Sequence, residues 1–281
     1  MKRILIPTDF SATAYNSASY GIQFANKIKA EKIVLLNAFQ APVNVSPDPM
    51  VPSIESFDFV TLKKASEESL TIFKQNVEKD LISKVPVSIL PECCTLTTDI
   101  DTLSKENDIS LIIMGITGKG SFSEIFIGSN TIQVSRHTNT PLLIIPPDAT
   151  YNPIKQILWV SDFKDVETTT PYEEISAILE ATGATLIVLH VDEEYNDLVG
   201  DIYAKEKAAI ATMFSKFNIE FFTANNSDFL GAVSEFSKLK QVDMVVVVPK
   251  VHFFPEKVFH QSYSKSLAFH TDLPLLMIKQ K

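Results

Sequence analysis

Two short stretches, 153 positions apart, indicate how this chain folds. The first reads ILIPTDF at residues 4–10, and the second reads ILWVSDF at residues 157–163. Each begins with apolar residues, which are typical of a short buried strand, and each ends on Asp-Phe, where a turn is expected. Because Asp162 lies 153 positions after Asp9, we interpret the two stretches as the first strands of two copies of one unit.

Further echoes of the first copy support an internal duplication. Residues 187–191 follow residues 33–38 at the same spacing of 153, residues 245–248 follow 111–114 by 134, and TDLPLL at 271–276 follows TNTPLL at 138–143 by 133. The second copy has therefore lost 19 residues between its second and fourth strands, and one more after the fourth. We place the boundary in the proline-bearing residues 146–153 and predict two domains, residues 1–147 and 153–281.

Strand-like and helix-like patterns alternate along both copies. In residues 13–28 small and apolar side chains recur with a helical period, and Ser11 is suited to cap this helix. The run IVLLNA at residues 33–38 is typical of a strand buried on both faces. The first copy is also expected to have a loop at 41–57 and strands at 88–95, 111–114 and 142–145. Its other expected helices lie at 61–83 and 130–137, and a further short helix ends at 103–107. This alternation predicts an α/β fold with parallel strands and right-handed crossovers.

Composition excludes several classes of protein. The 281 residues are 45% hydrophobic and 21% charged, which suits a chain that buries substantial cores. The net charge of −9 argues against nucleic-acid or membrane partners, because both attract basic surfaces. Apolar runs such as residues 244–248 fall far short of the roughly 20 residues of a membrane helix. No secretory signal fits the N-terminus, and the adjacent Cys93 and Cys94 suit a reducing environment, so we expect a cytoplasmic protein.

Glycines gather in one part of the chain. Four of the eight fall within fourteen positions, and they are Gly115, Gly118, Gly120 and Gly128. Gly115 directly follows a buried strand, at the end where open parallel sheets bind ligands. Gly128 and Ser129 open the next helix, whose free N–H groups and positive dipole end attract anions. The pattern predicts a phosphate-binding loop, although not a P-loop, because Lys119 is followed by Gly120 rather than by Ser or Thr.

Asp9 follows the first strand and has two interpretations. A carboxylate at this edge of the sheet accepts hydrogen bonds from ribose hydroxyls in dinucleotide-binding folds. Aspartate is also a common turn or capping residue before a helix. The local sequence does not decide between the two roles.

The spacing Gly115-x2-Gly118-x9-Gly128-Ser129 resembles the ATP-binding motif of the universal stress protein family, and residues 4–11 resemble the opening of that family. The chain as a whole resembles a tandem, two-domain member, more specifically in its first half than in its second. The resemblance implies two Rossmann-like domains of the adenine nucleotide alpha hydrolase-like type, each a five-stranded parallel sheet flanked by helices. It also implies ATP, ADP or AMP, with or without Mg²⁺, as the ligand of the first domain.

The resemblance assigns a nucleotide-binding role to residues from three parts of the first domain. They are Pro7, Thr8, Asp9, Ala38, Met114, Gly115, Thr117, Gly118, Lys119, Gly128, Ser129, Asn130 and Thr131. The first four would line the adenosine side, Met114 and Gly115 would flank the ribose, and the others would surround the phosphates.

The second half departs from this pattern. Pro249, His252 and Gln261 stand at or near the positions of the three motif glycines. Proline has no N–H, and the other two side chains would crowd a phosphate. We therefore predict that the second domain, although it keeps Asp162, binds no triphosphate and serves as a scaffold. His252 and His260 are interpreted as structural rather than metal-ligating, because they lack an acidic or Cys partner in register.

These residues are compatible with three alternative functions. The chain is a stress or regulatory protein that holds ATP as a ligand, a slow ATPase, or an interaction module without nucleotide. Phosphoryl transfer needs a metal, a cation and a positioned water, and beyond Lys119 the sequence shows no clear set of such groups. The glycine set argues against the third function, because glycine is unfavourable in regular structure. The sequence thus favours binding over catalysis, assigns no catalytic or metal-ligating residue, and leaves hydrolysis undecided.

Assembly is indicated only through the resemblance. Family members commonly pair through their last strands, which implies that residues 142–145 and 275–278 pair within this chain as a pseudo-dimer. A further homodimer and the protein partners are left open. The proline-rich residues 42–52 are interpreted as a lid, a docking loop, or a loop folded over its own domain.

Overall fold

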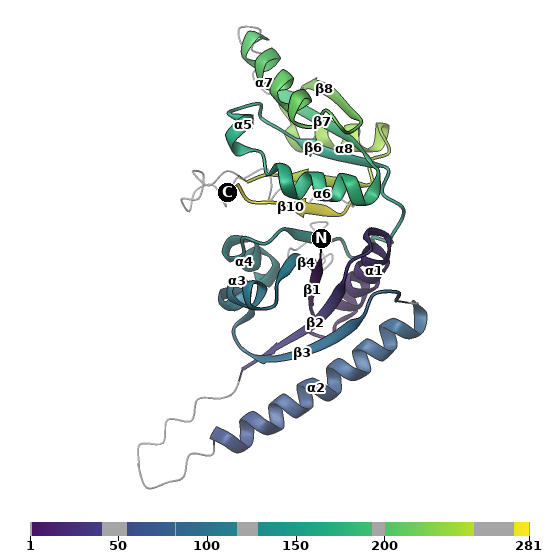
Figure 1. Cartoon of the computed structure of the whole chain (residues 1–281), viewed down its shortest axis with the longest axis vertical. Helices are drawn as coiled ribbons and strands as arrows, with labels where there is room; N and C mark the ends of the chain where they lie inside the picture. The colour runs from purple at the N-terminus through teal and green to yellow at the C-terminus, as the bar shows by residue number, and fades with distance from the viewer. Residues whose placement is uncertain are drawn as a thin grey trace, which may run out of the picture.

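The computed structural model describes residues 2–40, 55–81, 83–116, 129–192, 200–249 and 273–280. Strands and helices alternate through these residues as the sequence predicts (Figure 1). In chain order they are β1 (Arg3–Pro7), α1 (Ala12–Ile28), β2 (Lys32–Phe39), α2 (Glu55–Asp80), β3 (Val87–Cys93), α3 (Leu96–Glu106), β4 (Ile109–Gly115), α4 (Ser129–His137), β5 (Leu142–Ile145), β6 (Gln156–Val160), α5 (Val166–Thr169), α6 (Tyr172–Thr182), β7 (Thr185–Asp192), α7 (Gly200–Met213), β8 (Ile219–Asn225), α8 (Phe229–Leu239), β9 (Met244–Val247) and β10 (Leu275–Met277).

One ten-stranded sheet runs through the molecule in the order β3-β2-β1-β4-β5-β10-β9-β6-β7-β8. The strands of the first half, β1 to β5, pair in parallel, and so do those of the second half, β6 to β10. Each half has the same order around its own first strand, as expected of a duplicated unit. The predicted α/β fold of two tandem Rossmann-like units is confirmed.

The two halves meet at β5 and β10, the last strand of each half. These strands pair antiparallel, with Leu143 opposite Leu276. The predicted pairing of the last strands within the chain is therefore confirmed. Because of this antiparallel step, the carboxyl ends of β1–β5 and those of β6–β10 lie at opposite edges of the sheet.

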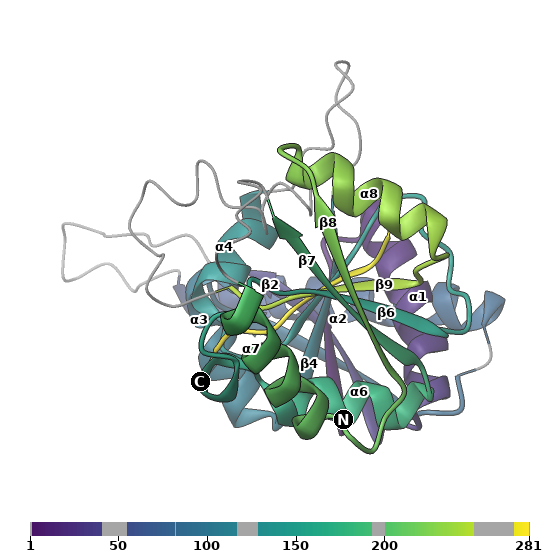
Figure 2. The ribbon, with the colours of Figure 1, turned by 90° about the horizontal axis from the view of Figure 1, so that it is seen from above.

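Helices cover both faces of the sheet, with a hydrophobic core under each layer. Phe24 of α1, Leu70 of α2 and Ile210 of α7 belong to one core. Ile100 of α3 and Ala232 of α8 belong to the other. Figure 2 shows the two layers in the second half, with α8 on one side of the strands and α6 and α7 on the other.

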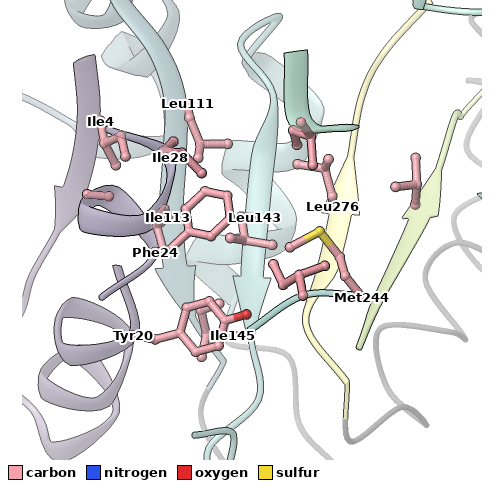
Figure 3. Packing of buried hydrophobic residues seen from close by; sticks show 14 of the residues in the cluster. Ile4, Tyr20, Phe24, Ile28, Leu111, Ile113, Leu143, Ile145, Met244 and Leu276 are labelled. Atoms are coloured by element: carbon pink, nitrogen blue, oxygen red, sulfur yellow. The ribbon is translucent and has the colours of Figure 1, made fainter. Parts of the chain in front are cut away.

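The core continues across the junction between the halves. Figure 3 shows Phe24 of α1 beside Leu143 of β5, with Leu276 of β10 and Met244 of β9 beyond that strand. All four side chains are fully buried. Because burial of one large apolar side chain contributes about 1.5–3 kcal/mol, this junction is a substantial source of stability.

Helix α1 forms where the sequence places it. The Ser11 Oγ accepts the Ala14 N–H at 3.2 Å, so Ser11 is the N-cap as predicted. The predicted apolar face between Ala14 and Ile28 is buried. In the second half the equivalent helix is interrupted at Pro171, which has no N–H to continue it, and the chain forms α5 and α6 instead.

The shortening of the second copy falls partly in one helix. Helix α2 has 26 residues, whereas its counterpart α7 has 14. The predicted loop at residues 41–57 was too long at its end, because α2 already begins at Glu55; residues 41–54 lie outside the described residues. None of the helices in the described ranges, α2 included, is long and apolar enough to cross a membrane.

Candidate functional site

The strand order of the first half changes direction at β1, between β1 and β4. From β1 the chain continues to β2 and β3 on one side, and it then returns to β4 and β5 on the other. In open α/β sheets, ligands bind beyond the carboxyl ends of the strands at such a switch point. Because β1 ends at Pro7 and β4 ends at Gly115, the residues that follow these positions form the candidate site.

Asp9 is exposed directly beyond β1, in a turn held by side chains. Its Oδ1 accepts the Ser11 N–H at 3.0 Å, and the Thr8 Oγ1 accepts the Phe10 N–H at 2.9 Å. These two bonds hold Phe10 at a φ of 64°, which is uncommon for a bulky residue. The turn role considered for Asp9 is therefore present, and its exposed carboxylate remains accessible to a ligand.

Gly115 lies at the end of β4, against the first turn of α1. A Cβ here would lie 2.7 Å from the Thr13 Cγ2 and 2.8 Å from the Thr13 carbonyl oxygen, so helix packing already requires a glycine. Among the described glycines, only Gly183 has a positive φ. Packing against Thr13, rather than an unusual backbone conformation, therefore explains Gly115 without a ligand. Met114 before it is 7% exposed and belongs to the core.

Helix α4 begins beside the end of β4. Thr131, which is 3% exposed, donates its hydroxyl to the Gly115 carbonyl oxygen at 3.2 Å. This bond positions the first turn of α4, which also contains the exposed Asn130. The first N–H groups of a helix have no partner within the helix, and they carry the positive end of its dipole. The predicted helix start thus lies at the switch point, whereas the Thr131 hydroxyl is used by the fold itself.

Sequence reasoning missed Asn37, which precedes the predicted Ala38 near the end of β2. The Asn37 Nδ2 donates to the Thr8 carbonyl oxygen at 2.9 Å, and its Oδ1 accepts the Ser66 hydroxyl at 2.7 Å. The available signal was a polar residue inside the apolar run at residues 33–38. Pro7 and Thr8 are buried, and Ala38 is half-buried. Among the four residues predicted to line the adenosine side, only Asp9 is exposed.

Part of the predicted site lies outside the described residues. This holds for Thr117, Gly118, Lys119 and Gly128, and for the side chain of Ser129. It also holds for the loop at residues 42–52 and for His252, His260 and Gln261. Their assigned roles stay predictions from the sequence.

The end of β6 repeats the turn at the end of β1. The Lys164 N–H donates to the Asp162 Oδ1 at 3.2 Å, and the Phe163 N–H donates to the Ser161 Oγ at 3.2 Å. Phe163 has a φ of 51°. The turn is thus a property of the duplicated fold, and by itself it does not mark a ligand site.

Aromatic side chains distinguish the two turns. Phe10 is 39% exposed, whereas Phe163 is 3% exposed. The Phe163 ring stacks on His190 with centroids 5.1 Å apart, and Tyr203 of α7 lies 4.4 Å from His190. In the first half, Asn37 occupies the position of His190, since the two are 153 residues apart. Aromatic packing therefore buries Phe163 of the second turn, whereas Phe10 of the first is exposed; Asp162, like Asp9, is itself exposed.

The site combines an acceptor with a helix start. Beyond β1 lies the exposed carboxylate of Asp9, and beyond the neighbouring β4 lies the first turn of α4. A carboxylate accepts hydrogen bonds from hydroxyl groups, and a helix N-terminus favours anions. The fold and the switch point define the class: a doubly wound α/β protein built of two tandem units.

The model of the universal stress protein family matches residues 1–146, and the chain belongs to this family. It is 27% identical over 161 residues to universal stress protein MJ0577 of Methanocaldococcus jannaschii, covering 51% of this chain and 94% of the relative. It is 26% identical over 153 residues to MJ0531 of the same organism, covering 51% and 81%. A solved universal stress protein from Archaeoglobus fulgidus superposes with a TM-score of 0.76 at 18% identity, covering 99% of this chain and 98% of that one. This last likeness concerns the fold alone.

Proposed function

We propose that the first half of this chain binds an adenine nucleotide at the switch point between β1 and β4. The observation that carries the proposal is the placement of the exposed Asp9 carboxylate and the start of α4 beyond two neighbouring strands. Ribose hydroxyls suit the carboxylate, and phosphates suit the helix start. The spacing of Gly115, Gly118 and Gly128 in the sequence supports the same ligand.

The second half acts as a scaffold in this proposal. Its domain would span residues 153–281, and the nucleotide-binding domain residues 1–147. The packing of Phe163, His190 and Tyr203 fills the space beside the turn beyond β6 with aromatic rings, although Asp162 itself is exposed. Pro249, just beyond β9, has no N–H to offer a phosphate. The expected stoichiometry is therefore one nucleotide per chain.

ATP is the proposed ligand, with ADP and AMP as alternatives. The described residues fit the nucleoside end through Asp9 and the phosphate end through the first turn of α4. Mg²⁺, where present, would enter with the phosphates and offset their charge. We infer a regulatory stress-response role in the cytoplasm, the reducing compartment that the free Cys93 and Cys94 suit.

A matched pair of variants tests the assignment. Asp9→Asn keeps an oxygen that accepts the Ser11 N–H, so the turn persists, but it removes the charge offered to ribose. Hydrogen bonds to charged groups contribute about 1.5–3 kcal/mol, so we expect ATP affinity to fall about 10- to 100-fold. Asp162→Asn makes the same change in the second half, and we expect unchanged affinity. Calorimetry and native mass spectrometry measure affinity and stoichiometry.

Each contrary outcome has a distinct meaning. Absence of heat with ATP, ADP and AMP, with and without Mg²⁺, on folded protein would refute nucleotide binding and leave an interaction module. Equal losses in Asp9→Asn and Asp162→Asn would refute the assignment to the first half. Hydrolysis above background that disappears in Asp9→Asn would establish the slow ATPase instead.

A further inference from the structure

The carbonyl of Thr8 takes its hydrogen bond from a side chain. Strand β1 ends at Pro7, and the Thr8 N–H makes the last main-chain bond to β2, at 2.8 Å from the Leu36 carbonyl oxygen. The Thr8 carbonyl oxygen then accepts the Asn37 Nδ2 at 2.9 Å. Thr8 is 7% exposed, so without this donor its carbonyl would be poorly solvated. Asn37 thus anchors the peptide that immediately precedes Asp9.

Ser66 of α2 determines which way the Asn37 amide points. Ser66 is 6% exposed, and its hydroxyl lies 2.7 Å from the Asn37 Oδ1 and donates to it. An amide rotated by half a turn would place its oxygen against the Thr8 carbonyl oxygen, where two acceptors repel each other. The two hydrogen bonds from Ser66 to Asn37 and from Asn37 to Thr8 therefore form together in only one orientation of the Asn37 amide. They connect the middle of α2 to the candidate site.

The second half keeps the bond with a different residue. His190, at the position equivalent to Asn37, places its Nδ1 3.0 Å from the Ser161 carbonyl oxygen. The Ser161 N–H bonds the Leu189 carbonyl oxygen at 3.0 Å, as Thr8 bonds Leu36. An amide and an imidazole differ in shape but share a side-chain N–H donor. The repeated requirement is therefore a donor to this carbonyl, rather than one residue type.

We propose that Asn37, oriented by Ser66, is a positioning residue of the nucleotide site, acting through the Thr8 carbonyl on the placement of Asp9. This inference rests on the proposed function. Asn37 acts on the nucleoside end only, because the peptide it anchors leads to Asp9, whereas the start of α4 is held separately by Thr131. Its loss should weaken all adenine nucleotides by one factor, whatever their number of phosphates.

Four variants of the full chain separate positioning from general stability. Asn37→Leu keeps the approximate shape and removes the donor, and we expect affinity for ATP and for AMP to fall by the same factor, about 3- to 10-fold. Asn37→His restores a donor of the kind the second half uses, and we expect affinity near wild type. Ser66→Ala frees the amide to rotate, and we expect a smaller loss. His190→Leu, the matched control, should lower the urea midpoint but leave both affinities unchanged.

Calorimetry with ATP and AMP at a temperature where every variant is folded by circular dichroism gives the readout. Wild-type affinity in Asn37→Leu would overturn the inference while leaving the proposed function intact. Failure of Asn37→His to recover affinity would overturn the donor argument, and an equal loss in His190→Leu would show a general effect on the fold. Lack of nucleotide binding by the wild type would instead refute the proposed function, and the inference with it.

Discussion

Leu143 of β5 lies directly opposite Leu276 of β10, and the two residues are equivalents in the duplicated sequence. Leu276 follows Leu143 by 133 positions, the spacing that also separates Pro274 from Pro141. Pairing of equivalent residues places a local two-fold axis between them, as in an isologous dimer contact. Both side chains are fully buried, so the apolar core runs unbroken through the junction. The chain therefore builds within one polypeptide the contact that two identical subunits would make.

This junction predicts that the halves unfold together. Leu143→Ala should lower the free energy of unfolding by about 2–5 kcal/mol, because it opens a cavity in packed core. Trp159, the single tryptophan, lies 3% exposed in the other half, and its fluorescence in urea should shift to a lower midpoint. Ile72→Ala on the exposed face of α2 is the control and should change stability by less than about 0.5 kcal/mol. An unchanged Trp159 transition in Leu143→Ala would mean that the halves unfold independently.

Gly115 predicts a packing defect that is separate from ligand binding. Gly115→Ala should cost about 1–3 kcal/mol, because the new Cβ meets both the methyl group and the carbonyl oxygen of Thr13. Adding Thr13→Ser removes the methyl contact but not the backbone one, so the double variant should recover only part of the loss. Urea unfolding without nucleotide measures both. Complete recovery would contradict a backbone clash.

The two adjacent cysteines should differ in reactivity. Burial, with the nearby Asp99 and Glu92 charges adding to it, raises the pKa of the Cys94 thiol to about 11, whereas Cys93 is exposed. Because the thiolate is the reactive form, Cys94 in a Cys93→Ser variant should react slowly with a thiol reagent at pH 8. Its rate should rise about tenfold per pH unit up to pH 10. Cys93 in a Cys94→Ser variant should react much faster at pH 8, and equal rates would contradict the difference.

Asp101 predicts a pH-dependent contribution to stability. It accepts the Lys105 Nζ at 2.6 Å and the Asn139 N–H at 2.9 Å, and the Lys105 hydrogen bond is the main cause that lowers the pKa of Asp101. A carboxyl group with a lowered folded pKa stabilises the protein above its unfolded pKa of about 3.9. That stability is lost as the pH falls through the folded pKa. Asp101→Asn should therefore be less stable than wild type at pH 7, and the gap should narrow towards pH 3.

Urea midpoints at the two pH values test this expectation. Asp108→Asn is the control, because the Asp108 side chain is 79% exposed and its ion pair with Arg3, at 3.5 Å, is a surface one. Such pairs contribute little, so this variant should match wild type at both pH values. A difference in urea midpoint between Asp101→Asn and wild type that stays constant with pH would contradict the charge-based explanation.

Local signals were sufficient for most elements of the fold. The Ser11 cap, the helical period of α1 and the apolar run of β5 each act within a few residues, and the structure places them as predicted. The similar stretches at residues 4–10 and 157–163 then implied the tandem architecture, because similar patterns of strands and helices in the same order fold into similar units. Element ends were less certain, as the early start of α2 at Glu55 illustrates.

The amino-acid pattern was sufficient to predict the duplicated α/β plan and the strand ends at the switch point, whereas the pairing of the last strands was predicted from the family resemblance. The roles of Gly115 and Asn37 became apparent only in the folded chain. Gly115 is required because a side chain there would clash with Thr13, which is distant in sequence. Asn37 of β2 hydrogen-bonds both Thr8, which follows β1, and Ser66 of α2. Periodicity and capping act between near neighbours, whereas these contacts exist only once separate strands and helices are packed together.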